Sequence, residues 1–268
     1  MSILILRSSA GGAAQLGSIL FNGNLAGTGS EVDRVAILAD STVLTANIGA
    51  EDMCFDVFLN ADTDNAGPAV STGNHYNWIN GNIAVDRDRF GQPRAWGLSL
   101  CDGRVAWGLN VGGTLRTLVG TTDIRGLGWS HVRGQRSFSS GDMWLYVRGD
   151  LEANGGGPSG DLSCPNTGNS GWDPYLLIGV EKHDADIVNF PSYYGGMCEL
   201  LFRNLIPSIG STITIPQEPW SVSVTGGRSL WRCNDGAGTT LADSIGNSPG
   251  TLLVGGGFPQ WSALSPFS

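Results

Sequence analysis

Two short acidic runs contain side chains that could bind a calcium ion. The run Asn60–Gly67 includes Asp62 and Asp64, and a second run includes Asp184 and Asp186. Carboxylate, amide and carbonyl oxygens are the ligands that Ca²⁺ prefers in proteins. The first run lacks the spacing and final glutamate of an EF-hand loop, so an ordinary Asx-rich turn is its competing explanation. A solvated charge run competes in the second case.

Aromatic side chains in polar segments could form the platform of a sugar-binding site. Sugars bind exposed aromatic faces together with hydrogen-bonding amide and carboxylate groups. Trp78 lies in residues 74–80, NHYNWIN, which supply both kinds of group. The candidate binding residues are Tyr76, Trp78, Asn80, Trp172, Tyr193 and Tyr194. Packing at the edge of the core explains these residues equally well, and the same aromatics would suit a protein interface.

No arrangement of residues predicts a hydrolytic nucleophile. Residues 157–161, GPSGD, miss the G-x-S-x-G motif by one position and precede no helical pattern. The three histidines are His75, His131 and His183. His131 alternates with Trp129 on a predicted strand, which favours a half-buried structural histidine. We therefore expect that the chain is not an enzyme.

Composition limits the classes of partner. The 268 residues carry 15 basic against 24 acidic side chains, a net charge of −9, and no basic cluster. Nucleic-acid binding is therefore not expected. No stretch approaches the roughly 18 apolar residues of a membrane-spanning helix, so membrane insertion is not expected either. The 41 glycines and the charged fraction of 15% are untypical of a helical protein.

The cysteines and the first residues indicate a reducing compartment. No C-x-x-C pair occurs, so a structural zinc site is not predicted, and buried reduced thiols are expected instead. Residues 1–6 are too short for the apolar core of a signal peptide. The chain is expected to be made and kept in a reducing cytoplasm, or released without secretion. The five cysteines are Cys54, Cys101, Cys164, Cys198 and Cys233.

The elements that must position these residues are strands and turns, and the clearest is a hairpin over Ala95–Val111. Apolar residues alternate on both sides of Asp102-Gly103, a dipeptide that favours a type I′ turn. A two-residue turn pairs Leu100 with Val105, which places all the alternating apolar side chains on one face.

Further alternating segments predict an all-β protein. Loops are expected over Asn60–Asn82 and Asn154–Gly171, and no helix of ten residues is predicted. Many short strands without helices indicate a sandwich or barrel, and the lack of an internal repeat favours a jelly-roll sandwich over a propeller. Cys198, Leu200 and Phe202 are expected on one face of the last strand. The other predicted strands are Gly17–Asn22, Arg34–Leu38, Met53–Leu59, Trp129–Arg133, Met143–Val147, Tyr175–Gly179 and Met197–Ile206.

Six segments in order carry a family resemblance that covers residues 15–210. They resemble motifs of the concanavalin A-like lectin/glucanase superfamily, in particular its laminin G-like domains. Each motif is weak alone, and Arg148 stands where the family usually has Asp. The segments are Phe21–Val35 (F-D-G…D-R-V), Cys54–Leu59 (F-T-I-x-F-W), Gly126–Val132 (G-x-W-H-H-V), Leu145–Gly149 (L-Y-V-D-G), Tyr175–Gly179 (L-x-I-G) and Tyr193–Phe202 (Y-x-G-x-I-D-E-L-R-I).

The resemblance implies an antiparallel jelly-roll β-sandwich, a role in binding carbohydrate or protein, and calcium as the common cofactor. Glucanases of this superfamily carry a Glu-x-Asp-x-x-Glu strand, because retaining hydrolysis needs two carboxylates about 5 Å apart. Glu31 and Asp33 match only the first two positions of that motif. Glycoside hydrolysis is therefore not expected.

The C-terminal part has an unusual position. Residues 230–261 are similar to the segment that opens many such domains, yet here the segment comes last. Some forty residues cannot bury a core alone. The predicted organisation is an N-terminal arm over 1–16, a sandwich over 17–210 and an extension over 211–268 that docks on the sandwich or on a neighbour.

These observations lead to a functional hypothesis. Lectin-like domains normally act outside cells, whereas this sequence has no signal peptide, glycosylation sequon or disulfide pattern. A bacteriophage virion protein reconciles these facts, since it is assembled in the host cytoplasm and exposed after lysis. We expect a virion surface component, either a capsid decoration protein or part of a tail or fibre, with a lectin-like capacity for host glycans.

The expected partners are other copies of the chain, with a trimer as the expected state, other virion proteins and cell-surface glycans. An exported bacterial lectin is the alternative, and a glycoside hydrolase without the usual motif is the third hypothesis.

Overall fold

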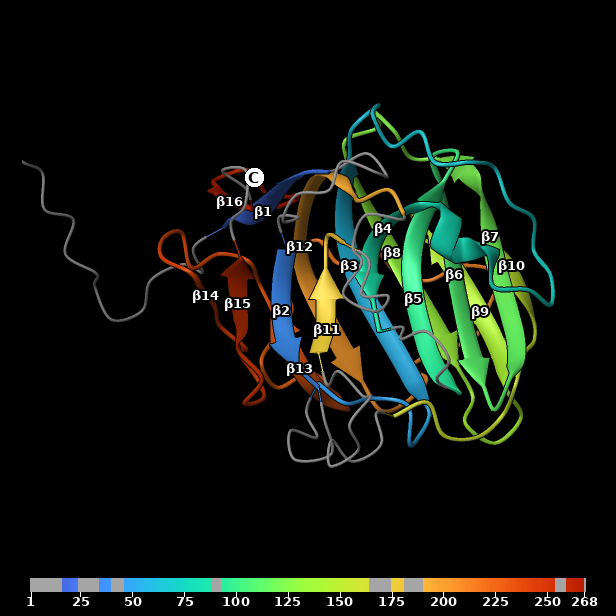
Figure 1. The fold of residues 1–268 in the computed structure, drawn as a ribbon. Coiled ribbons are helices and arrows are strands. Elements are labelled where there is room, and N and C mark those ends of the chain that lie inside the picture. Colours follow the sequence, from blue (N-terminus) through green and yellow to red (C-terminus); the bar gives the residue numbers. More distant parts are fainter. Residues whose placement is uncertain are drawn as a thin grey trace, which may run out of the picture.

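The computed structural model describes residues 16–23, 34–39, 46–87, 93–163, 175–180, 190–253 and 259–267. Within these residues, two antiparallel sheets face each other as a sandwich (Figure 1). The helical structure described is one 3₁₀ turn, η1 (Asn77–Asn80). In this part of the chain no helix is long and apolar enough to cross a membrane. The predicted all-β antiparallel sandwich is confirmed.

The chain passes repeatedly between the two sheets, as a jelly roll does. Sheet A has β10 (Asp150–Gly156), β9 (Asp142–Val147), β8 (Trp129–Arg136), β3 (Met53–Ala61), β12 (Tyr194–Arg203), β1 (Ser18–Asn22) and β16 (Gln260–Ser262) in that order, with β13 (Gly227–Trp231) also paired to β12. Sheet B has β14 (Thr240–Leu241), β15 (Gly250–Leu253), β2 (Arg34–Leu38), β11 (Tyr175–Ile178), β4 (Asn82–Asp86), β5 (Arg94–Cys101), β6 (Arg104–Val111) and β7 (Thr114–Asp123).

Aromatic side chains fill the space between the sheets. Phe55 on β3 stacks on Trp96 of β5 with ring centroids 5.9 Å apart, and its ring meets Trp107 of β6 edge-on at 5.4 Å. Phe55 therefore faces the core. Because side chains alternate along a strand, Asp56 and Phe58 face the outer side of sheet A.

The predicted hairpins are confirmed. β5 pairs with β6 in the expected register, with Leu100 opposite Val105. Asp102 and Gly103 have φ values of 51° and 71°, as a type I′ turn requires. β8 and β9 form the second hairpin, and a further tight turn leads from β9 into β10.

One predicted strand face is wrong. Glu199 has a φ of 52°, and the register of β12 against β3 shifts beside it. Cys198 therefore pairs with Phe58 on the outer face, whereas Phe202 pairs with Phe55 on the core face. A bulge of this kind breaks the simple alternation on which the prediction rested.

Two loop predictions have different outcomes. The segment expected as a loop from Asn154 is still strand up to Gly156, because β10 pairs with β9 through that residue. The long connection before β4 contains η1 but no strand. The part of the later loop at residues 164–174 lies outside the described residues.

A carboxylate joins the edges of the two sheets. Glu152 of β10 accepts hydrogen bonds from the backbone N–H groups of Thr121 (2.7 Å) and Thr122 (3.1 Å) on β7, and from the Thr122 hydroxyl. It thereby supplies acceptors for backbone groups of an edge strand, which otherwise remain open to another chain.

The C-terminal residues complete both sheets. β13 pairs with β12, β15 with β2, and β16 with β1. Trp231 is fully buried and meets the ring of Phe202 edge-on at 5.1 Å. These strands are thus part of the sheets and their core, a closer association than the docking expected of them. The predicted arm lies outside the described residues, apart from Leu16.

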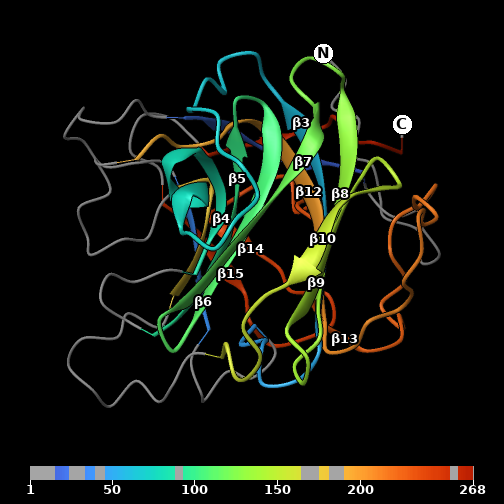
Figure 2. The same cartoon turned by 90° about the vertical axis from the view of Figure 1, so that its right-hand side faces the viewer.

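Residues 204–226, named the strap here, connect β12 to β13 and lie outside sheet A (orange in Figure 2). Both ends of the strap meet, since the Asn204 N–H donates to the Gly226 carbonyl at 3.1 Å. The middle of the strap reaches the β9–β10 turn, where the Ile213 N–H donates a hydrogen bond to the Gly149 carbonyl at 2.7 Å. The strap therefore covers part of the outer face of sheet A.

Candidate functional site

Trp78 does not form an exposed platform. It is fully buried in η1, on the outer side of sheet B. It lies over Gly97 and Gly108, which pair across β5 and β6, and a Cβ atom at either glycine would overlap the indole ring. The sequence prediction is corrected on this point, because the two glycines form a recess that the indole fills.

Tyr193 is also buried and offers no free ring face. Its hydroxyl donates to the Gly196 carbonyl at 3.0 Å, and its ring meets Phe21 edge-on at 6.3 Å. This candidate therefore belongs to the core. Tyr194 is half-buried where β12 begins.

The remaining aromatic candidates do not form a common site in the described residues. Tyr76 packs its ring against that of Trp78, with centroids 5.3 Å apart. Asn80 is half-buried in η1. Trp172 lies outside the described residues.

Asp62 and Asp64 lie in an exposed turn. The Asp62 carboxylate accepts hydrogen bonds from the Thr63 hydroxyl (3.1 Å) and the Asp64 N–H (3.3 Å), which is the pattern of an Asx turn. The buried Asn65 amide donates to the carbonyls of Asp62 (2.8 Å) and Tyr194 (2.7 Å). These contacts hold the turn against the start of β12.

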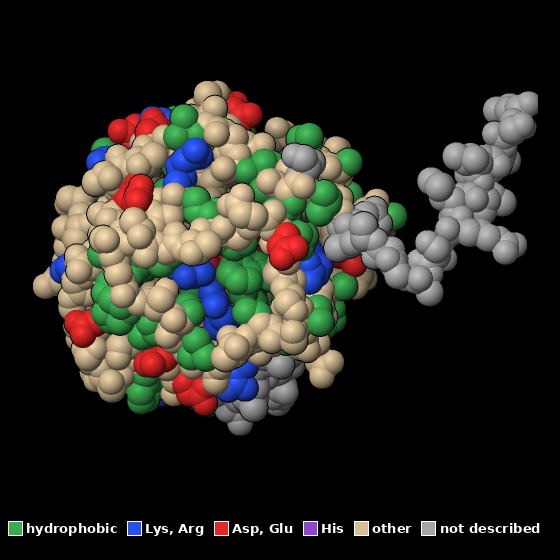
Figure 3. All heavy atoms as spheres, turned by 180° about the vertical axis from the view of Figure 1, so that it is seen from behind, with side chains coloured by type: hydrophobic (Ala, Val, Ile, Leu, Met, Phe, Trp, Pro, Cys, Tyr) green, Lys and Arg blue, Asp and Glu red, His purple; other side chains and the backbone are tan. Residues whose placement is uncertain are grey.

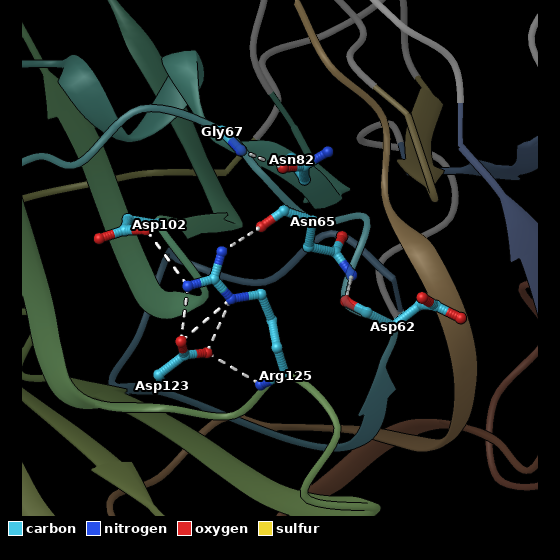
Figure 4. Close-up of polar contacts among 7 residues, drawn as sticks. All are labelled: Asp62, Asn65, Gly67, Asn82, Asp102, Asp123 and Arg125. Carbon is cyan, nitrogen blue, oxygen red and sulfur yellow. Dashed lines mark hydrogen bonds and ion pairs between the residues drawn. The ribbon is translucent and has the colours of Figure 1, made fainter.

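Arg125 pairs with two carboxylates near this turn. Its guanidinium binds Asp123 at 2.6 Å and Asp102 at 3.2 Å, and it also donates to the Asn65 carbonyl at 3.4 Å (Figure 4). Among the described residues, no group of three or more His, Cys, Asp or Glu side chains could hold a metal ion. The other calcium candidates, Asp184 and Asp186, lie outside those residues.

A buried charged cluster lies on the outer face of sheet A. The Asp56 side chain is fully buried on β3. One carboxylate oxygen accepts hydrogen bonds from Arg133 Nε (2.6 Å) and His131 Nε2 (2.9 Å), both on β8. The other oxygen accepts a hydrogen bond from Arg203 on β12. Three neighbouring strands therefore meet at one carboxylate.

The cluster is charged at neutral pH. Burial alone would raise the pKa of Asp56, but the hydrogen bond to His131 and the charges of Arg203 and Arg133 hold this pKa well below its usual range. Burial lowers the pKa of Arg203, but the Asp56 charge more than offsets this, so the pKa is raised. Burial and the Asp56 charge raise the pKa of the neighbouring Cys54 thiol to about 12, so no thiolate nucleophile forms there.

A pocket of about 640 Å³ lies between this cluster and the strap. Arg133 and Arg203 form its floor. Cationic side chains are visible near the middle of this face, with hydrophobic side chains beside them (Figure 3). The walls come from the strap, namely Ser208, Thr214, Ile215, Pro216, Gln217, Glu218, Pro219, Trp220 and Ser221.

Trp220 is held in the pocket wall by contacts of its ring and of its backbone. Its ring stacks on the Arg203 guanidinium, which lies 5.0 Å from the ring centroid. Its backbone N–H donates to Glu199 at 2.9 Å, and its carbonyl accepts a hydrogen bond from Arg232. Arg232 also pairs with Glu199 at 3.3 Å. The indole is therefore presented by a fixed backbone.

The chemistry of the pocket suits binding. It combines two guanidinium groups, one indole and several hydroxyl and amide groups. Among the described lining residues, Glu218 is the only carboxylate, whereas glycoside hydrolysis needs a pair. The pocket contains none of the binding residues predicted from the sequence.

Sequence reasoning missed this site because its parts are far apart in the chain. Asp56 and Arg203 are separated by 147 positions. One local signal was present, since His131 and Arg133 alternate with Val132 in a strand and so share a polar face in its middle. A basic residue buried at mid-strand needs a partner, which could have directed attention to Asp56.

Comparisons with known proteins found distant similarity to solved structures. No protein-family model matches the sequence, and no curated protein does. Solved structures that align with this chain include a heptameric SAP-like pentraxin from Limulus polyphemus, with a TM-score of 0.46 and 13% identity over 75% of this chain and 78% of that one.

Two laminin fragments also align. Domains LG4-5 of the mouse laminin alpha1 chain give a TM-score of 0.44 and 10% identity, over 90% of this chain and 52% of that one. The LG1-3 region of the laminin alpha2 chain gives 0.44 and 10%, over 74% of this chain and 33% of that one. This likeness concerns the β-sandwich fold alone.

Proposed function

We propose that this chain is a non-enzymatic carbohydrate-binding protein and that its site is the pocket between sheet A and the strap. The observation that supports this best is Trp220, an indole fixed in the wall of a 640 Å³ pocket. An aromatic ring can cover the apolar face of a sugar, while the hydroxyl and amide groups of the wall can bind sugar hydroxyls.

A binding role agrees with the groups that line the pocket. Cys54 below the floor is a buried thiol whose raised pKa keeps it protonated. Glu218 has no second carboxylate beside it among the described lining residues. The hydrolase hypothesis therefore gains no support from this site.

The test is the Trp220→Leu variant on an array of neutral and charged glycans, followed by calorimetry with a glycan that binds. We expect the unchanged chain to bind and the variant to lose about tenfold or more in affinity, because stacking on an aromatic ring is lost. The matched control is Trp144→Leu, since Trp144 is half-buried on β9 and does not line the pocket.

Two results would contradict this function. One is glycan binding by Trp220→Leu with the affinity of the unchanged chain, in a variant that is shown to be folded. Folding is shown by a near-ultraviolet circular dichroism spectrum that matches the unchanged chain outside the tryptophan band. The other is the absence of binding to any glycan by the unchanged chain.

The setting that we propose for this activity is the surface of a bacteriophage virion, as a homo-oligomer. The support is the sequence together with free, buried cysteines at Cys54, Cys101, Cys198 and Cys233, which suit folding in a reducing compartment. The comparisons add no support for a bacteriophage origin. Native mass spectrometry of the recombinant chain tests the oligomer, and a stable monomer that binds no capsid or tail protein would contradict this setting.

A further inference from the structure

We propose that the ligand of this pocket is an acidic saccharide, whose carboxylate or sulfate group binds at Arg133 and Arg203. This inference rests on the proposed function and specifies its ligand class. The shared chemistry is an anionic group on a sugar, and the observations that point to it are the charge of the pocket floor and the hydrogen-bonding capacity that remains there.

The floor carries more positive than negative charge. Arg133 and Arg203 share the single carboxylate of Asp56, and His131 and Cys54 also contact that carboxylate. Two guanidinium groups therefore meet one anion. Only 5% of Arg133 and 4% of Arg203 are exposed, so water screens this charge poorly. An uncompensated charge at such a site is costly, and an anionic ligand would relieve that cost.

The guanidinium groups at the floor are donors with no acceptor atom. Arg133 lines the pocket and uses Nε on Asp56, and its two terminal nitrogens form no hydrogen bond within the described residues. Arg203 Nε and Trp220 Nε1 are buried and have no hydrogen-bond partner among the described residues. A carboxylate or sulfate offers only acceptors and matches the fork of a guanidinium, which a neutral sugar hydroxyl does not.

The nearby acidic side chains do not neutralise the floor. Glu199 is occupied by Arg232 and the backbone of Trp220. Glu218 is exposed on the strap and forms no ion pair within the described residues. Glu218 should instead repel an acidic ligand weakly. Replacing Glu218 should therefore strengthen acidic binding, whereas replacing an arginine of the floor should weaken it.

The experiment uses an array of matched neutral, carboxylated and sulfated oligosaccharides, followed by calorimetry at two salt concentrations. The unchanged chain should prefer acidic members, with an affinity that falls as salt is raised. Arg133→Gln should weaken acidic binding about tenfold or more. The control is Arg228→Gln, which removes an equal charge from the exposed ion pair with Glu51.

Glu218→Gln keeps the test valid if the arginine variant does not fold. Glu218 is exposed, so its replacement should leave the fold intact and strengthen acidic binding about two- to fivefold. The carboxylated and sulfated members of the array distinguish the two sources of the anionic group.

The outcomes separate this inference from the proposed function. Acidic binding that Arg133→Gln weakens and Glu218→Gln strengthens supports both. Neutral glycan binding that depends on Trp220 but is unchanged in both charge variants overturns the inference and leaves the function standing. The absence of binding to every glycan overturns both.

Discussion

At the residue scale, Asp56 is the group on which the outer face of sheet A depends. Its carboxylate is fully buried and is shared by side chains from β8 and β12. Removing either the buried carboxylate or one of its cationic partners would leave an uncompensated buried charge, which destabilises the folded state. The same residue therefore affects both the stability of sheet A and the shape of the pocket floor.

The first prediction is that Asp56→Asn lowers the free energy of unfolding by about 3–5 kcal/mol, because it leaves two buried guanidinium groups without an anion. Urea denaturation followed by circular dichroism measures this. Asp64→Asn is the control, since Asp64 is exposed, and it should change stability by about 0.5 kcal/mol or less. An equally small effect of Asp56→Asn would contradict the role assigned to the cluster.

The second prediction concerns pH. The pKa of Asp56 is held below its value in the unfolded chain, so the charged form contributes stability at pH values above about 4. That contribution is lost as the pH falls below 4 toward the folded-state pKa. The unchanged chain should therefore lose stability steeply in acid. Asp56→Asn should show a shallower loss when both are titrated in a fixed urea concentration.

The charged cluster also shows what the sequence could not reveal. His131 was interpreted as a half-buried structural histidine from its alternation with Trp129, which is local information, and the structure buries its side chain completely. Its partner Asp56 lies 75 positions away, and the pairing depends on which strands become neighbours. Residue type and spacing therefore predicted burial but not the partner.

At the element scale, η1 is fixed by a recess in sheet B. Trp78 fits over Gly97 and Gly108, which have no side chains and lie opposite each other. Local sequence made Trp78 resemble a binding aromatic, since polar residues surround it. The two glycines that bury it come 19 and 30 positions later, and only the hairpin register brings them together. The hairpin itself was predictable, because its turn is local.

The third prediction is that Gly108→Ala displaces Trp78 and lowers the free energy of unfolding by about 1–3 kcal/mol, as overpacking does. Gly156→Ala is the matched control, since a Cβ there has no neighbour within 4 Å and Gly156 also lies in a strand. Urea denaturation gives the stabilities, and tryptophan fluorescence reports exposure of the indole. Equal stability of the two variants would show that the recess is not tightly filled.

The fourth prediction concerns Glu152, which joins β10 to the edge of β7. Glu152→Ala removes the acceptor of the Thr121 and Thr122 amides, so hydrogen exchange at these two amides should accelerate. Exchange elsewhere in β7 should change less. Glu218→Ala serves as the control for loss of a carboxylate. Unchanged exchange at Thr121 and Thr122 would mean that other contacts protect this edge.

At the scale of the whole molecule, the described residues of the C-terminal part, 227–253 and 259–267, are part of the fold. β13 and β15 extend sheets A and B, and Trp231 lies in the core between them. The sequence predicts that this segment cannot fold alone, and the segment packs against the rest of the sandwich. It did not indicate insertion into both sheets, because strands this short carry little periodicity, and their partners lie far away in the chain.

The fifth prediction is that a chain ending at residue 226 does not form the sandwich. Removal of β13 and β15 would expose the core faces of their partners, β12 and β2. The truncated chain should lose its near-ultraviolet circular dichroism signal and bind a hydrophobic dye. A cooperative unfolding transition with a native spectrum would instead show that these residues only dock on a complete sandwich.

The pairing of β1 with β16 has a consequence for how the protein is made. Ser18 lies opposite Ser262, and the other partner of β1 is β12. During synthesis, β1 therefore leaves the ribosome long before either partner exists. β2 is in the same position, since it pairs with β11 and β15. Such non-local pairing slows folding and leaves apolar strands unpaired for most of translation. These unpaired strands are the segments that a chaperone would bind to prevent aggregation.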